Sequence, residues 1–363
     1  MALQLQLFKT SFSYYSFYQT YNIDRQVPDS AGTATAFLCG VKANYETLGV
    51  NAHVKASDTN CDAIKSNSVN SILKWAIDSG KSAGVVTTTR ITHATPGASY
   101  SHVAHRDWEN NAMLPNSLHP NCKDIARQLI EDTPGNQLRV ILGGGRRHFL
   151  PKHIPDHFDP TLFGERTDGV NLIDKWLEAK RLQTERENQY KFVNSSAQLR
   201  DVDFANVEYL MGLFNHNHVS YHAERDPSQE PSLEEMAKAA LKVLSKNPNG
   251  YVLLVEGGRI DHAHHQNWAN QALRETVSFD ETVESISKKV NLDETLLVVT
   301  ADHAHTLTLN GYPERGTPIS GFSDYNETGS EMLFTTLMYG NGPGNTSPRV
   351  TPVNTGMETN RPQ

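Results

Sequence analysis

The amino-acid sequence predicts an α/β fold: a doubly wound, mostly parallel sheet with helices on both faces and a functional site at the strand C-termini. Apolar, β-branched runs alternate along the chain with segments of helical periodicity, as in βαβ units. Polar clusters directly follow several of these runs, where parallel sheets carry their sites. The 363 residues suffice to bury a large core, and we expect a single domain over 1–363.

The expected elements follow one another without an internal repeat. In order, they are a helix over 62–79, a strand over 83–88, a helix over 122–131, a strand over 139–142, a helix over 233–245, a strand over 251–255, a helix over 268–290 and a strand over 295–299. A capping box of Ser232 and Glu235 opens the third of these helices. Residues 151–217 are polar and punctuated by Pro and Gly, which is more typical of an insertion than of the core.

Composition and charge argue against two classes of partner. The net charge is −8 and no Lys/Arg-rich run occurs, so we expect no nucleic-acid partner. No run of about 18 apolar residues is present, so we expect no transmembrane segment. Residues 1–21 lack the charged, apolar and small-residue regions of a secretory signal.

The Asp29–Ser30 pair leads into a run of small residues over 31–36. Small side chains leave the first turn of a helix open, so free backbone N–H groups and the positive end of the helix dipole are expected to face Ser30. A serine in this position is either the N-cap of the helix or a nucleophile that accepts a phosphoryl group.

Two clusters of metal-binding side chains follow the strands expected at 251–255 and 295–299. The first contains Glu256, Asp261 and His265, and the second contains Asp302 and His303. Carboxylate with imidazole suits zinc, whereas carboxylate with hydroxyl suits magnesium. Asp261 and His265 are four residues apart, so one helical turn places both on the same face.

Over about residues 18–344 the chain resembles the alkaline phosphatases of the animal type. The resemblance rests on six motifs, at 28–36, 88–96, 105–108, 140–146, 256–265 and 300–305. It implies a phosphate-monoester hydrolase that acts through a phosphoserine intermediate with two zinc ions and one magnesium ion. Small phosphomonoesters would be the substrates, and the family forms homodimers at the extracellular surface, held by a GPI anchor.

The resemblance also implies a role for each motif residue. Ser30 is the implied nucleophile, and Arg106 is the group that holds the non-bridging phosphoryl oxygens through its planar fork. The implied zinc ligands are two pairs, Asp302 with His303 and Asp261 with His265. Thr95 and Glu256 match the magnesium site, with Asp29 and His93 close by.

Simpler interpretations exist for several of these residues. In isolation, Arg106 would more often form a surface ion pair and Thr95 a turn before Pro96. The histidines His262, His264 and His305 are expected to support the site rather than bind metal, and 143–145 is expected to be a tight turn rather than a phosphate cradle. Calcium is not expected, because the family's calcium site falls on amide and carbonyl groups here, at Gln198, Phe214 and Asn215 with Glu230.

The chain has three cysteines, so one thiol remains after a single disulfide has formed within the chain. The resemblance pairs Cys61 with Cys122 in a disulfide and leaves Cys39 free and buried. Glycosylation sequons at Asn194, Asn326 and Asn345 also fit a secreted glycoprotein.

Two parts of the family's pattern have no counterpart in the 363 residues: an N-terminal strand ending in Asp-Gly-Met-Gly and a zinc-binding His near the C-terminus. We therefore expect each zinc site to keep two ligands from this chain, which is truncated at both ends relative to the family, with neither signal peptide nor anchor signal. We also expect little phosphatase activity from these residues alone. The alternative function is a catalytically inactive family member that acts as a binding or interaction protein.

Overall fold

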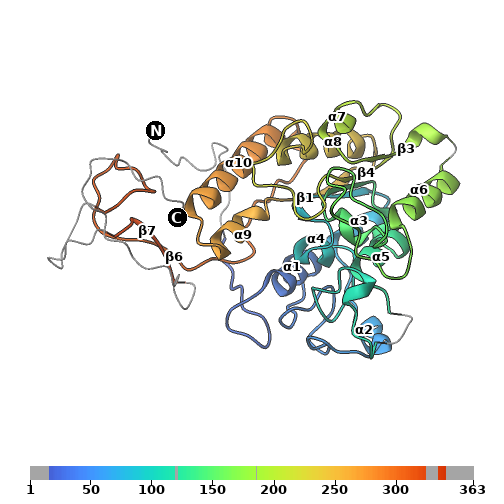
Figure 1. The fold of residues 1–363 in the computed structure, drawn as a ribbon, viewed down its shortest axis with the longest axis horizontal. Helices are drawn as coiled ribbons and strands as arrows, with labels where there is room; N and C mark the ends of the chain where they lie inside the picture. Colours follow the sequence, from blue (N-terminus) through green and yellow to red (C-terminus); the bar gives the residue numbers. More distant parts are fainter. Residues whose placement is uncertain (1–15, 119–121, 185, 324–333, 341–363) are drawn as a thin grey trace.

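Five strands form the central sheet, and their parallel pairing confirms the predicted α/β class (Figure 1). The computed structural model describes residues 16–118, 122–184, 186–323 and 334–340. The strands are β1 Ser82–Arg90, β2 Val140–Gly144, β3 Tyr190–Val193, β4 Tyr209–Leu213 and β5 Tyr251–Glu256. Their order across the sheet is β3–β4–β2–β1–β5, and every neighbouring pair is parallel. The carboxyl ends of the strands therefore meet at one edge.

Helices cover both faces because successive residues of a strand point to opposite sides of the sheet. Val85 and Ile141 belong to one buried core and their neighbours Val86 and Leu142 to another. The first core is shared with α1 Ser30–Cys39, α3 Ile72–Asp78, α5 Ile125–Glu131 and α6 Leu172–Gln183, and the second with α8 Leu233–Leu244. The two cores thus lie between the sheet and the helices on its two faces.

The remaining elements are short or lie outside these layers. They are α2 Cys61–Ser66, α4 Ala94–Ala98, α7 Ser196–Arg200, α9 Arg259–His265, α10 Ala269–Ser287, the single turns η1 Asn111–Met113, η2 Gly135–Gln137, η3 Arg146–His148 and η4 Glu187–Gln189, and the strands β6 Leu307–Leu309 and β7 Leu337–Tyr339. α10 packs against both α8 and α9. β6 and β7 form a separate antiparallel pair at the left of Figure 1.

The prediction of one continuous helix over 62–79 is wrong, because two separate helices, α2 and α3, occupy this region. Asn67 ends α2, where its side chain donates to the carbonyl of Ala63 at 2.8 Å. Ser71 starts α3, where its hydroxyl accepts the backbone N–H of Lys74. Each polar side chain satisfies backbone groups at a helix end, which stabilises a break between the two helices.

The strand predicted over 295–299 is also wrong, since residues 295–300 form no strand. The side chains of Leu296 and Val298 are 88% and 70% exposed. An apolar, β-branched run becomes a strand only where a partner supplies its backbone hydrogen bonds, and no strand of the described residues pairs with it. The strand predicted over 251–255 is present as β5, which is an outermost strand of the sheet with every residue half-buried.

Residues 151–217 differ from the expected insertion in their second half. They supply β3 and β4, and β4 pairs with β2 inside the sheet with all five of its residues buried. The polar, Pro-rich composition describes the loops before Leu172, where α6 begins. The hydrophobic run that forms β4 is short and lies within a polar stretch, so it was not recognised as a strand.

Cys61 and Cys122 form a disulfide with a Cα–Cα distance of 5.8 Å, which confirms the pairing that the family resemblance implied. Cys39 is free and buried in α1, as expected. The sequon residue Asn194 lies just before α7, whereas Asn326 and Asn345 lie outside the described residues.

We expect thiol-alkylating reagents to label Cys39 only after the protein is unfolded. Burial raises the pKa of its thiol to about 12, and the thiolate is the reactive form. Peptide mapping of non-reduced protein, alkylated before and after denaturation, checks this. A label on Cys61 or Cys122 in the native, non-reduced protein would contradict the disulfide.

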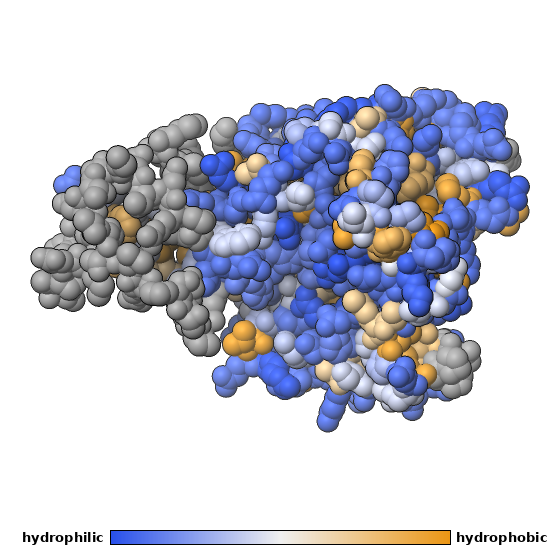
Figure 2. All heavy atoms as spheres, viewed as in Figure 1, coloured by the Kyte–Doolittle hydropathy of each residue, from blue (hydrophilic) through white to orange (hydrophobic). Residues whose placement is uncertain are grey.

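The face drawn in Figure 2 is mainly hydrophilic, with apolar side chains in separate groups. Among the helices of the described residues, none combines the length and apolar character needed to cross a bilayer.

Candidate active site

The candidate site lies where α1 begins and where β1 and β5 end. Asp29 and Ser30 come from the start of α1, His93 and Thr95 follow β1, and the residues of α9 follow β5. The segment 300–305 reaches the same place, because His303 Nε2 lies 3.2 Å from the hydroxyl oxygen of Ser30. Residues distant in the sequence therefore meet at the edge that the parallel sheet predicts.

Asp29, and not Ser30, is the N-cap of α1. Its carboxylate accepts the backbone N–H groups of Ala31 and Gly32, both at 3.2 Å. The expectation that these first-turn N–H groups are free is therefore wrong, because the preceding carboxylate already satisfies them. The capping interpretation of Ser30 is excluded, and its hydroxyl is left to face His303. Ser30 is 8% exposed, so a small part of it remains accessible.

Arg106 lies beside the start of α1. Its guanidinium forms an ion pair with Asp29 at 3.1 Å and contacts Nε2 of His93 at 3.3 Å. Asp29 also accepts a hydrogen bond from the side chain of Asn22 at 2.8 Å. Because the capping carboxylate fixes the guanidinium near Ser30, the arginine can offer its remaining N–H groups to an anion there.

Both predicted zinc pairs are assembled. Asp302 Oδ2 lies 3.2 Å from His303 Nε2, and it also accepts the Thr33 hydroxyl at 3.4 Å. Asp261 Oδ1 lies 3.4 Å from His265 Nε2, one turn apart in α9 as predicted.

His305 lies between the two pairs, although only a supporting role was predicted for it. Its Nε2 lies 2.5 Å from Asp261 Oδ1, and ligand atoms of Asp261, His303 and His305 lie within 4.8 Å of one another. Burial alone would raise the pKa of Asp261, but the His305 hydrogen bond and the nearby imidazoles lower it to about 2. One ionised carboxylate with two imidazoles is a donor set that fits zinc.

Thr95, which is buried, and Glu256, which is half-buried, lie together, as the magnesium prediction requires. The Glu256 carboxylate accepts hydrogen bonds from the hydroxyls of Thr87, at 2.5 Å, and Thr95. Burial raises the pKa of Glu256, and these two hydroxyls act against that shift. A cation would favour the charged carboxylate, and a carboxylate with a neighbouring hydroxyl fits magnesium.

Three histidines meet beside these residues: His93, His218 and His262. Their ring centroids lie 4.3 to 5.2 Å apart and their ligand atoms within 4.8 Å of one another. Burial lowers the pKa of all three, that of His262 to about 4. The imidazoles are therefore neutral at pH 7.

Each of these imidazoles also contacts an arginine. Arg106 lies 3.3 Å from His93, Arg90 lies 2.5 Å from His218, and Arg259 lies 3.0 Å from His262. Permanent positive charges at these nitrogens oppose a cation in the middle of the cluster, even though three imidazoles could otherwise bind one. His218 was not predicted from the sequence. The signal for it was its position, five residues after the end of β4, a strand that was not predicted either.

The residues that the resemblance matches to a calcium site lie in α7, directly after β4 and shortly before α8. The amide nitrogen of Asn215 donates to the carboxylate of Glu230, and the backbone N–H of Ser220 lies 3.3 Å from the same oxygen. Gln198 accepts the backbone N–H of Asn194. Hydrogen-bond donors thus face the Glu230 carboxylate where a cation would need oxygens. That calcium is not bound stays a prediction.

Comparison with known proteins identifies the family of the chain. The alkaline phosphatase family model matches residues 4–360. The chain is 46% identical over 337 residues to the tissue-nonspecific alkaline phosphatase isozyme of Felis catus, which aligns 92% of this chain with 63% of that protein. A membrane-bound alkaline phosphatase of Bombyx mori is 46% identical over 331 residues, which are 90% of this chain and 58% of that protein. The chain thus spans about three fifths of the length of these relatives.

Solved structures support the same fold. The crystal structure of Thermus thermophilus alkaline phosphatase matches with a TM-score of 0.63 at 30% identity, over 82% of this chain and 53% of that one. The alkaline phosphatase from the Antarctic bacterium TAB5 matches with a TM-score of 0.59 at 24% identity, over 82% of this chain and 72% of that one. The second match bears on the fold alone.

Proposed function

Since this chain belongs to the alkaline phosphatase family, we propose that its site residues form the phosphoryl-transfer centre of a phosphate-monoester hydrolase. The observation that carries the proposal is the position of Ser30. Its hydroxyl is free of any capping role and faces His303, while Arg106 is fixed close by through Asp29. A nucleophile, a guanidinium and two Asp–His pairs at one sheet edge are the components that this reaction needs.

The reaction proceeds in two displacements at phosphorus. Ser30 Oγ attacks the ester phosphorus as the hydroxyl proton is lost, the bond from phosphorus to the leaving oxygen breaks, and the phosphoryl group is carried on the serine. Water then attacks the same phosphorus, the bond to Ser30 Oγ breaks, and inorganic phosphate is released. Arg106 holds the non-bridging oxygens throughout, because its planar N–H groups match their geometry.

The residues assigned to metal binding fall into three groups. Asp302 with His303 and Asp261 with His265 would hold two zinc ions, with His305 hydrogen-bonded to Asp261. Thr95 and Glu256 would hold magnesium, with Asp29 and His93 as neighbours. Bound metal ions supply positive charge that favours loss of the serine proton and stabilises the leaving oxygen.

The proposal extends to the setting of the protein. We infer small phosphomonoesters as substrates, a homodimer and a location outside the cell. The Cys61–Cys122 disulfide supports an oxidising compartment, and the silkworm relative is described as membrane-bound.

Covalent trapping tests the assignment of Ser30. The protein, supplied with zinc and magnesium, is incubated with a phosphomonoester, quenched in acid and digested, and the phosphopeptides are mapped by mass spectrometry. We expect the phosphoryl group on Ser30 of wild-type protein and no phosphopeptide from Ser30→Ala. A phosphoryl group on another residue, or label that persists in the variant, would contradict the mechanism.

We expect Arg106→Ala to weaken turnover of a chromogenic phosphomonoester without abolishing it. Loss of a bidentate, charged hydrogen bond should cost roughly 1.5–3 kcal/mol of transition-state binding, or about a 10- to 150-fold loss in kcat/KM. Steady-state kinetics measures the loss, and Arg106→Lys is the matched variant that keeps the charge without the planar fork. Unchanged kcat/KM in Arg106→Ala would remove the arginine from the site.

A further inference from the structure

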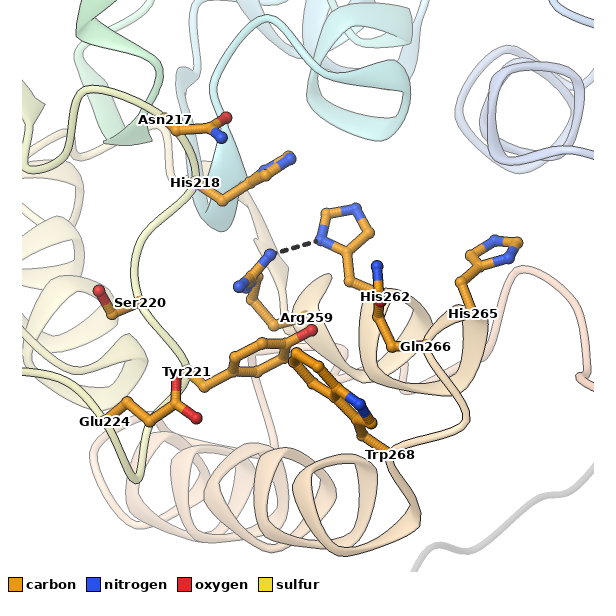
Figure 3. Close-up of a pocket in the computed structure, with 10 residues that line it drawn as sticks. All are labelled: Asn217, His218, Ser220, Tyr221, Glu224, Arg259, His262, His265, Gln266 and Trp268. Carbon is orange, nitrogen blue, oxygen red and sulfur yellow. Dashed lines mark hydrogen bonds between the residues drawn. The ribbon is translucent and has the colours of Figure 1, made fainter. Parts of the chain in front are cut away.

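A cavity of about 520 Å³ opens beside the candidate active site, on the side of α9 (Figure 3). His265, one of the predicted zinc ligands, lines it, together with His262 and Arg259 from the same helix. Tyr221 and Trp268 form an aromatic wall, with ring centroids 5.9 Å apart. The cavity is therefore continuous with the metal-binding face of α9 and lies outside the residues assigned to the phosphoryl group.

Arg259 occupies the middle of this cavity in Figure 3. Its guanidinium lies 3.8 Å above the Tyr221 ring and contacts Nδ1 of His262 at 3.0 Å. Its Nε is buried and has no hydrogen-bond partner. Within the part of the chain that the structure describes, no carboxylate lies within 4.0 Å of Arg259, whereas Arg90 and Arg106 each pair with one. A partly buried guanidinium without a counter-ion is costly.

The nearest acidic side chains are already engaged elsewhere. Glu224 lines the cavity at the end away from His265, and it accepts a hydrogen bond from the Gln271 side chain at 2.5 Å. Glu275 is buried and accepts the backbone N–H of His222. Both attract Arg259 through space without touching it. The guanidinium thus keeps donors for an external ligand.

We propose that this cavity binds a second anionic group, a carboxylate or a phosphate, carried on the leaving group of the substrate. The inference rests on the proposed function, since it adds a subsite for the part of the ester that departs. Arg259 supplies the charge and a planar pair of donors, which suits either anion. His218 and His262 line the same cavity, and their ring nitrogens add further hydrogen-bonding groups.

The position of Trp268 fits this arrangement. Its side chain is 39% exposed at the mouth of the cavity, next to Tyr221. A leaving group that reaches from the zinc side of α9 to Arg259 passes this aromatic wall, so a flat or apolar spacer between the two anionic groups gains contact area there. The substrates favoured by the cavity are therefore phosphomonoesters with a second anion on an aromatic or apolar spacer.

The test compares two inert ligands that differ only in the second anion: phenylphosphonate and 4-carboxyphenylphosphonate. Their dissociation constants are measured by calorimetry on the full chain supplied with zinc and magnesium. We expect the carboxylated ligand to bind about tenfold more tightly, as one charge-assisted contact implies. This preference should disappear in Arg259→Gln and return in part in Arg259→Lys. Arg274→Gln, which removes an exposed charge from α10, is the control and should keep it.

Equal dissociation constants for the two ligands in wild-type protein would overturn the proposal, as would a preference that survives in Arg259→Gln. Benzoate separates this failure from failure of the proposed function, because it carries the second anion without a phosphonate. If neither phosphonate binds but benzoate binds and loses affinity in Arg259→Gln, the cavity is an anion site and the phosphoryl assignment is wrong. If benzoate does not bind either, the cavity is not an anion site.

Discussion

Ser30→Ala is expected to lower kcat for a chromogenic phosphomonoester by at least about a thousandfold, because the variant must hydrolyse the ester without a covalent intermediate. The methyl group of alanine keeps the helix start intact, since the capping carboxylate of Asp29 and the backbone N–H groups of Ala31 and Gly32 that donate to it are unchanged. The loss should therefore appear in kcat while the protein folds normally. Initial rates with zinc and magnesium supplied measure the ratio even where wild-type turnover is slow.

Thr33→Ala is the matched control for this prediction. It removes a hydroxyl from the same turn of α1, which donates to the Asp29 carbonyl at 3.0 Å and to Asp302 at 3.4 Å. Since that hydroxyl only supports the site, we expect a loss of about tenfold or less. Comparable losses in the two variants would show that helix geometry, and not a nucleophile, accounts for the effect of Ser30→Ala. Thermal unfolding of both variants verifies that the fold is retained.

The parts of the site that could be predicted are those in which a local pattern carries the chemistry. Ser30 stands at a helix start, Asp261 and His265 lie one turn apart, and Asp302 is next to His303 in the sequence. Such short spacings bring side chains together whatever the rest of the fold does. The carboxyl-end rule for parallel strands then places the separate motifs at one edge.

The parts that could not be predicted depend on tertiary contacts. His218 was missed because it meets His93 and His262 only through the order of the strands, and no spacing in the sequence encodes that meeting. The capping role of Asp29 was not predicted, because Asp and Ser are about equally good caps and Ser30 was considered for that role. Residues 295–299 have the composition of a strand, but strand formation needs a partner that composition does not supply.

Glu109→Gln is the change expected to destabilise the fold most. Glu109 is buried and accepts hydrogen bonds from Arg90, at 2.6 to 3.1 Å, and from the Thr92 hydroxyl at 2.6 Å. The substitution leaves the Arg90 guanidinium without its carboxylate, and breaking one side of a buried ion pair costs roughly 3–5 kcal/mol. Urea unfolding at pH 7 measures the loss. Arg90 also contacts His218, so the histidine cluster should be disturbed as well.

The same carboxylate makes the wild-type protein sensitive to acid. Burial alone would raise the pKa of Glu109, but His148, Arg90 and Thr92 lower it to about 2. Burial lowers the pKa of His148 to about 3, so Arg90 is the permanent positive charge beside Glu109. A carboxyl whose pKa is lower in the folded state stabilises it fully above the ordinary value of 4.5 and loses that effect as the pH falls to about 2. We therefore expect unfolding free energies measured between pH 5 and 3 to fall more steeply for wild type than for Glu109→Gln. Glu178→Gln, at an exposed pair with Arg181, should follow the wild-type slope. Parallel slopes for wild type and Glu109→Gln would mean that folding does not lower the pKa of Glu109 and that Arg90 does not stabilise its ionised form.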